Sequence, residues 1–272
     1  MAARKLEKGV MIALLILGGL LMMVPFIWMI TSSFKPENEF TVFPPTIIPH
    51  HPTWKNYVDL FVKIQFFVYL KNTLLIVFWS FVGMFLNAIA GYSFAKFDFP
   101  AKNTLFYLVL GTMMIPGQVT MIPTYLIINE MGLVNSMTGI VLPGLVGAFG
   151  IFLFRQFMST VPSDLIEAAR LDGAGELRIF FGLILPIVKP VFAVQGILTF
   201  IGAWNSFLWP LIIANDESLY TLSVGLNLLK GQYSSNFGLQ MAGAAFMVLP
   251  IIIIFSFFQK HIIEGATISG MK

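Results

Sequence analysis

The residues with the most informative spacing form one polar stretch, Glu167 to Pro186, which reads EAARLDGAGELRIFFGLILP. It lies between apolar segments that are long enough to cross a membrane. The chemistry that such a stretch could do is recognition, because a chain this apolar has little use for a charged hairpin at a membrane surface unless another protein docks there. The competing interpretation is a surface loop that lipid headgroups alone stabilise.

The first half of the stretch has the pattern of a short helix with two different faces. Ser163 is a favourable N-cap, and Asp164 in the first turn complements the helix dipole, so a helix is predicted over residues 165–171. The residues that share one face at i, i+3 and i+4 are Leu165, Ala168 and Ala169. Because two of these three residues are alanine, the side chains on this face are small enough for the helix to enter a groove. On the exposed side, Glu167 and Arg170 could pair.

The second half is predicted to turn back as another helix. Asp172 and Gly173 should end the first helix, because glycine readily adopts the left-handed conformation. A second helix should run from Glu176 to about Phe181, and Pro186 precedes the next apolar segment. The resulting helix–turn–helix could pass motion from a docked partner to the neighbouring membrane helices.

Motifs for independent catalysis are missing from the sequence. There is no Gly-Lys pair, so ATP cannot bind through a GxxxxGK[ST] loop. The histidines His50, His51 and His261 form no HExxH motif, there is no GxSxG, and there is no cysteine for a disulfide or a thiolate metal site. The sequence therefore predicts no enzyme activity, no metal and no bound cofactor. Energy for any uphill transport would have to come from a partner chain.

The composition predicts an all-α, polytopic membrane bundle. Apolar residues make up 57% of the chain and charged residues 11%, whereas soluble domains carry about a quarter charged residues. Six charge-free runs are each long enough for a membrane-spanning helix of about 20 residues. They are residues 9–34, 72–95, 103–129, 131–154, 190–215 and 231–259.

The distribution of basic residues predicts the orientation, because lysine and arginine collect on the inner side. With the N-terminus inside, the inner segments hold Arg4, Lys5, Lys8, Lys96, Lys102, Arg155, Arg170, Arg178, Lys189, Lys260 and Lys272. The outer segments hold Lys35, Lys55, Lys63, Lys71 and Lys230. We therefore predict six spans with both termini inside. Residues 1–71 form the first span and an outer loop, 72–260 the core with an inner loop at 155–189, and 261–272 an inner tail.

The middles of the spans hold neutral polar groups but no Asp, Glu, Arg or His, which argues against ion coupling. The neutral groups are Asn87, Thr112, Gln118, Thr120, Gln195, Asn205 and Ser206. Most could serve helix–helix hydrogen bonds, worth about 0.6 kcal/mol each. Some could instead line a path for a neutral sugar or polyol.

Asn205 is the strongest candidate in the sequence for a residue that lines the substrate pathway. Gln118 and Asn87 are further candidates. Trp204 and Trp209 flank Asn205, and aromatic faces can stack on sugar rings. The alternative for these tryptophans is the ordinary role of anchors at the membrane interface.

Pro116 and Gly117 are predicted to interrupt the third span, and Pro123 to close it. The interruption could be a hinge or an ordinary kink.

The polar stretch also resembles the EAA signature of ABC-importer permeases, EAA-x3-G-x9-I-x-LP. The residues that match it are Glu167, Ala168, Ala169, Gly173, Leu185 and Pro186, with Leu183 in place of isoleucine. Nearly the whole chain resembles the carbohydrate-uptake branch, on the side of the smaller maltose-type permease subunit. The segments that carry this likeness include SSFKPENEF, GYSFAKFDFPAKN, MMIPGQVTMIPTYLI, GIFLFRQF, FIGAWNSFLWPLI and MAGAAFMVLPIIIIFSFFQKHIIEG.

The resemblance implies a type I ABC-importer permease in the cytoplasmic membrane of a prokaryote. Its partners would be a second permease subunit, in a heterodimeric or a homodimeric pore with the heterodimer favoured, two ABC ATPases that bind ATP and Mg²⁺, an extracytoplasmic solute-binding protein and a sugar. The residues implied in ATPase coupling are Glu167, Ala168, Ala169, Arg170, Asp172, Gly173 and Pro186. By position, residues 220–237 would reach into the binding protein, and residues 265–272 could contact the ATPases.

Two other functions stay open on the residues alone. An ion-coupled secondary transporter would work without an ATPase, through an ion site built from ionisable groups or backbone carbonyls. A non-transporting membrane scaffold would tolerate charge reversal at Glu167 or proline at Gly173 without loss of uptake.

Overall fold

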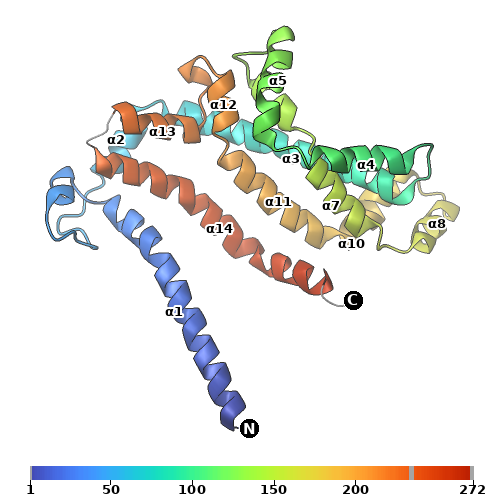
Figure 1. The fold of residues 1–272 in the computed structure, drawn as a ribbon, viewed down its shortest axis with the longest axis horizontal. Coiled ribbons are helices and arrows are strands. Elements are labelled where there is room, and N and C mark those ends of the chain that lie inside the picture. The colour runs from blue at the N-terminus through green and yellow to red at the C-terminus, as the bar shows by residue number, and fades with distance from the viewer. Residues whose placement is uncertain (1, 233–235, 270–272) are drawn as a thin grey trace. The chain divides into compact units, whose positions relative to one another are not determined.

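The computed structural model describes residues 2–232 and 236–269, and within these ranges the regular elements are all helical (Figure 1). The elements up to the hairpin are α1 (Ala2–Ser32), η1 (Glu37–Thr41), α2 (Lys55–Lys63), α3 (Phe66–Lys96), α4 (Lys102–Thr112), α5 (Gly117–Glu130), α6 (Met137–Val141), η2 (Leu142–Gly144) and α7 (Ala148–Met158). The elements after it are α8 (Ser163–Leu171), α9 (Glu176–Ile179), η3 (Phe180–Ile184), α10 (Leu185–Ile187), α11 (Lys189–Trp204), α12 (Leu208–Ile213), η4 (Glu217–Leu219), α13 (Leu222–Gln232) and α14 (Phe237–Ser269). The expectation of an all-helical fold is confirmed for the described residues.

Four helical segments in the described part of the chain are long and apolar enough to cross a membrane: Leu6–Ser32, Phe66–Lys96, Lys189–Ile213 and Phe237–Gln259. Two further pairs of helices are long and apolar enough to cross a membrane only when the two helices of each pair are taken together. They are α4 with α5, bent by 102°, and Met137–Gly144 with α7, bent by 41°. By length and composition, the described residues thus hold four candidate spans, or up to six if each bent pair counts as one.

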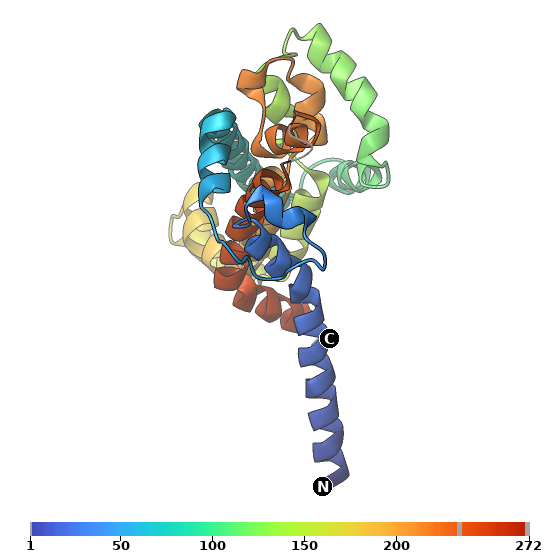
Figure 2. The ribbon, with the colours of Figure 1, turned by 90° about the vertical axis from the view of Figure 1, so that its left-hand side faces the viewer.

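The sharp bend between α4 and α5 lies where the sequence predicted an interruption (Figure 2). Pro116 caps α5 with an extended backbone, φ −59° and ψ 132°. Proline has no amide hydrogen, and its ring disfavours helical geometry in the residue before it, so the ladder stops there. The expectation that Pro123 closes the segment is wrong. Pro123 lies inside α5, where the loss of a single backbone hydrogen bond is tolerated, and the helix continues to Glu130.

The chain divides into two compact units. The first comprises Met1–Phe67 with Gly225–Pro250, and the second Val68–Val224 with Ile251–Lys272. Within the first unit, Asn56 of α2 donates hydrogen bonds to the carbonyls of Ser33 and Lys35, both at 2.8 Å. Short helices η1 and α2 lie on either side of the proline-rich residues 42–54, which are themselves not helical, as proline disfavours an unbroken ladder.

The two histidines in residues 42–54 contribute to the structure of the loop through their backbone amides. Glu39 is buried, and its two carboxylate oxygens accept hydrogen bonds from the backbone amides of His50 and His51 at 3.0 and 2.8 Å. The backbone of the pair, rather than its imidazoles, therefore fixes the fold of the loop.

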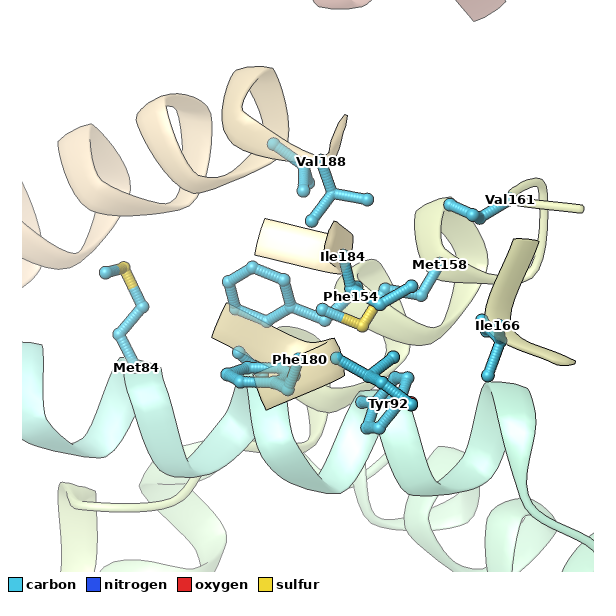
Figure 3. Close-up of a cluster of buried hydrophobic side chains, with 12 residues drawn as sticks. Met84, Tyr92, Phe154, Met158, Val161, Ile166, Phe180, Ile184 and Val188 are labelled. Carbon is cyan, nitrogen blue, oxygen red and sulfur yellow. The ribbon is translucent and has the colours of Figure 1, made fainter. Parts of the chain in front are cut away.

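The core of the second unit joins α3, α7 and α11 to the polar stretch that the sequence singled out (Figure 3). Phe154 and Met158 of α7 are fully buried there, with Tyr92 of α3 beside them. Helices α3 and α7 approach closely at Gly91, where a Cβ atom would meet the Cβ of Phe154 at 2.7 Å. This close packing places the end of α3 against the polar stretch.

Candidate functional site

The polar stretch folds as a hairpin of two helices, called here the hairpin (residues 163–187). Gly173 has φ +77°, as predicted, and its amide bonds the carbonyl of Arg170 at 3.0 Å. The next amide, of Ala174, bonds the carbonyl of Ala169 at 3.0 Å. This pair of bonds is the Schellman motif, which satisfies the last carbonyls of α8 and reverses the chain.

The start of α8 differs from the expectation at Ser163. The helix begins at Ser163 itself, and the capping position belongs to Pro162, whose backbone is extended at φ −58° and ψ 133° and which gives no side-chain cap. The predicted Ser163 cap is therefore wrong by one residue, because the fixed φ of proline already provides the entry into the helix. Asp164 does lie in the first turn.

The expected ion pair within α8 is also replaced by another. Arg170 Nε donates to Glu176 Oε1 at 2.7 Å across the turn, rather than to Glu167, which is exposed. The Schellman turn folds Glu176 back beside Arg170, which explains the choice of partner. The hydrogen bond from Arg170 holds the pKa of Glu176 below its ordinary value, although partial burial acts in the opposite direction.

Glu176 also connects the hairpin to α3. Tyr92 Oη donates to Glu176 Oε2 at 3.1 Å, and the guanidinium of Arg170 lies 5.7 Å from the ring centre of Phe97. At the end of α3, the ammonium group of Lys96 donates to the carbonyl of Val161, just before the hairpin. These polar contacts hold the hairpin at one end of the bundle.

The two sides of α8 have different environments, though not with the predicted membership. Ile166 is 2% exposed and enters the core, and Ala169 packs against that core from its edge. Leu165 and Ala168 are exposed. The face that was predicted to enter a groove is thus divided between the core and the surface.

Two leucines at the turn of the hairpin stand out by their exposure. Leu171 at the end of α8 is 90% exposed, and Leu177 in α9 is 71% exposed. Leucines beside charged residues at an exposed turn are suited to contact with another protein surface.

The second helix of the hairpin runs on toward α11 instead of ending at Phe181. Pro186 has no amide hydrogen and cannot bond the carbonyl of Gly182. The backbone hydrogen bonds before it therefore join residues five apart instead of four apart, as in a π-helix. Residues Phe180–Ile184 form a π-helix, and the amide of Leu185 bonds the carbonyl of Phe180. Phe180 and Ile184 are buried in the core, so the hairpin is packed directly against α3 and α7 (Figure 3).

A cavity of about 760 Å³ lies in the second unit, between residues of α3, α5, α6, α7, α11 and α12. Asn87 and Gln118 from the predicted pathway set both line it. The other polar lining residues are Ser80, Thr120, Thr124, Gln195, Thr199, Ser206 and Trp209. Amides, hydroxyls and one indole therefore face the same space.

Asn87 has a structural task as well. Its Oδ1 accepts a hydrogen bond from the amide of Gly147 at 3.0 Å, where the chain enters α7. A Cβ atom on Gly150 would meet Asn87 Nδ2 at 2.8 Å, so glycine there makes room for the amide.

Trp204 and Asn205 lie outside the residues that line the cavity. Trp204 is buried and stacks on Phe200 with ring centres 5.5 Å apart. Asn205 ends α11, and its side-chain amide donates to the carbonyl of Ile201 at 3.0 Å. The structure therefore brings together Asn87 and Gln118 but not Trp204 and Asn205.

Gln195, Thr120 and Ser206 belonged to the wider set of neutral polar groups that could line a path, and Trp209 was noted beside Asn205, but none of the four was selected as a pathway candidate. They come from separate elements, and the bend before α5 and the non-helical residues 205–207 before α12 are not evident from polarity alone. Trp209 also donates from Nε1 to the carbonyl of Gly139 at 3.2 Å, which connects α12 to α6.

Comparison with known families agrees with the fold and the hairpin. Residues 83–267 match the family described as binding-protein-dependent transport system inner membrane component. This match covers more than half of the chain, and the chain belongs to this family. The resemblance to ABC-importer permeases is confirmed. The chain is therefore a multi-pass permease subunit of the cytoplasmic membrane and not an enzyme, since a separate ATPase hydrolyses ATP in such transporters.

Individual relatives are similar along almost their full length. The arabinooligosaccharides transport system permease protein AraQ of Bacillus subtilis is 37% identical over 257 residues, which cover 93% of this chain and 92% of the relative. The diacetylchitobiose uptake system permease protein NgcG of Streptomyces coelicolor is 30% identical, with 92% and 84% covered. The sn-glycerol-3-phosphate transport system permease protein UgpE of Yersinia pestis is 31% identical, with 93% of each covered.

Solved structures show the same fold. A chain of a bacterial ABC transporter involved in the import of the acidic polysaccharide alginate aligns with a TM-score of 0.85 at 21% identity, over 96% of this chain and 98% of that one. A chain of the bacterial alginate ABC transporter in complex with an alginate pentasaccharide-bound periplasmic protein aligns at 0.67 and 14% identity, over 93% and 94%. At these identities the likeness concerns the fold alone.

Proposed function

We propose that this chain is a permease subunit of an ATP-driven importer that moves a sugar, either a mono- or oligosaccharide or a polyol, inward by alternating access. The relatives named above are permeases for arabinooligosaccharides, diacetylchitobiose and glycerol 3-phosphate, and the first two of these solutes carry several hydroxyl groups. The cavity supports the same class, because its amides and hydroxyls suit hydrogen bonding to a neutral polyhydroxyl compound.

The proposal includes six spans with both termini in the cytoplasm. Each bent pair then counts as one span, and the eleven inner and five outer basic residues agree with that orientation. It also includes the division into residues 1–71, a core permease domain at 72–260 with a cytoplasmic loop at 155–189, and a tail at 261–272.

The observation that carries the proposal is the construction of the hairpin. It is closed by the turn at Gly173, joined to α3 through Glu176 and packed into the core through Ile166 and Phe180. A rigid element so attached can move α3 and α7 when its exposed end is moved. We assign the residues of the EAA motif to ATPase coupling: Glu167, Ala168, Ala169, Arg170, Asp172, Gly173 and Pro186.

The complete transporter would contain a second permease subunit, two ABC ATPases and an extracytoplasmic solute-binding protein. One of the alginate structures includes a periplasmic protein, which supports the last of these partners. Substrate would pass through the cavity beside Asn87 and Gln118. Trp204 and Asn205 stay in the proposal as residues of the adjoining end of α11, where they would shape the path without lining this cavity.

The test reverses one charge on the hairpin. Glu167→Lys should abolish co-purification of the ATPase and reduce ATP-driven uptake to background, because the side chain is exposed on the docking element. Glu130→Lys at the exposed end of α5 is the matched charge reversal and should leave both unchanged. Both variants should insert into membranes at wild-type levels, measured by immunoblot. ATPase binding that survives Glu167→Lys would contradict the proposal.

A further inference from the structure

The side chain of Gln195 in α11 lines the cavity and has an unfilled hydrogen-bonding position. It is 8% exposed and belongs to the cavity lining. Its Oε1 is buried and accepts no hydrogen bond, and its Nε2 lies 3.5 Å from Thr199 Oγ1, at the outer limit for a hydrogen bond. Native proteins seldom leave such a group unpaired unless water or a ligand completes it.

The orientation of the amide does not remove this feature. Turning the carboxamide over would exchange Oε1 and Nε2, so that a donor rather than an acceptor would be left unpaired. A hydroxyl group can serve either case, because it both donates and accepts. The missing partner of Gln195 is therefore of the kind that water or a sugar hydroxyl provides.

The surroundings of Gln195 favour a polyhydroxyl ligand over a single water molecule. The cavity volume of about 760 Å³ is in the range of pockets that hold small molecules, roughly 300–1,000 Å³. The amide of Gln118 and the hydroxyl of Ser206 line the same space, and Trp209 adds an aromatic ring. Several separated hydrogen-bonding groups, together with the aromatic side chains of Trp209 and Phe149, match the edges and face of a sugar.

We propose that Gln195 is a specificity-determining residue that hydrogen-bonds a hydroxyl of a neutral saccharide in this cavity. The inference rests on the proposed transport function. Binding of the sugar here would hold it in the path after the binding protein releases it. Loss of the contact would therefore lower the amount of sugar moved per ATP hydrolysed, and the solute-binding protein's own affinity would stay the same.

The experiment uses the complete transporter in proteoliposomes with saturating, sugar-loaded binding protein. The wild type is first assayed with arabinotriose, diacetylchitobiose and sn-glycerol 3-phosphate, and the best transported neutral sugar becomes the probe. Gln195→Met keeps the length of the side chain and removes the amide. It should lower sugar import per ATP hydrolysed roughly three- to tenfold, the effect of one neutral hydrogen bond, while ATP hydrolysis itself is retained.

The controls separate this proposal from the proposed function. Gln156→Met, an exposed glutamine of α7 outside the cavity, should behave as the wild type. Gln195→Glu, which keeps an acceptor at this position, should recover part of the import that Gln195→Met loses. Unchanged import per ATP in Gln195→Met would overturn the role of Gln195 alone. A wild type that imports only glycerol 3-phosphate, or none of the three by ATP hydrolysis, would overturn the neutral-sugar function on which it rests.

Discussion

Glu176 is the residue on which the attachment of the hairpin depends most, because it accepts hydrogen bonds from Arg170 on one side and from Tyr92 on the other. The ion pair with Arg170 is partly exposed, so its own contribution to stability is small. The ion pair matters mainly because it positions the carboxylate of Glu176 within hydrogen-bonding distance of the Tyr92 hydroxyl. One pair of hydrogen bonds thus connects the EAA motif to a membrane helix.

Removing the hydroxyl of Tyr92 tests that connection. Tyr92→Phe should lower the free energy of unfolding by about 1 kcal/mol, because one partly buried hydrogen bond is lost while the ring keeps its packing against Phe97 and Phe180. Thermal unfolding in nanodiscs measures it. The exposed Tyr107→Phe is the matched control, and equal melting temperatures for the two variants would argue against the connection.

At the scale of elements, the hairpin depends on the left-handed turn at Gly173. A side chain there would be strained by its φ of +77°, although its Cβ atom would meet no other group within 4 Å. The strain is therefore of the backbone alone. The neighbouring Gly175 has an ordinary extended backbone, φ −71° and ψ 158°, and equally open space around it.

These two glycines give a matched pair of substitutions. Gly173→Ala should destabilise the chain by about 1 kcal/mol and weaken ATPase binding, because the left-handed region is unfavourable for an L residue by about that much. Gly175→Ala should change neither. Thermal unfolding and co-purification with the ATPase measure the two effects, and equal behaviour of the two variants would show that the turn does not need glycine.

The helices and their breaks could be predicted from the sequence more accurately than the contacts between side chains. Four of the charge-free runs coincide with long helical segments and the other two with bent helix pairs. The breaks at Pro116 and Gly173 follow from the backbone chemistry of proline and glycine. The partner of Arg170 could not be predicted, because it depends on how the turn folds Glu176 back. The cavity lining could not be predicted either, since the 102° bend before α5 decides that Gln118 lines the same cavity as Asn87.

At the scale of the whole molecule, the proposed topology can be tested with unusual ease because the chain has no native cysteine. A single Asn38→Cys lies in the proposed outer loop, and a single Ser159→Cys lies just before the hairpin; both native residues are exposed. In spheroplasts, a membrane-impermeant maleimide should label the first at once and the second only after permeabilisation. The reverse pattern would contradict the orientation with both termini inside.

We propose that this chain moves its solute only when a separate ATPase acts on the hairpin. The most direct measurement is uptake of labelled sugar into proteoliposomes that contain the permease subunits and loaded binding protein, with and without the ATPase. We expect uptake that requires both the ATPase and hydrolysable ATP, and a sodium or proton gradient should not replace them. Gradient-driven uptake without the ATPase would contradict this proposal.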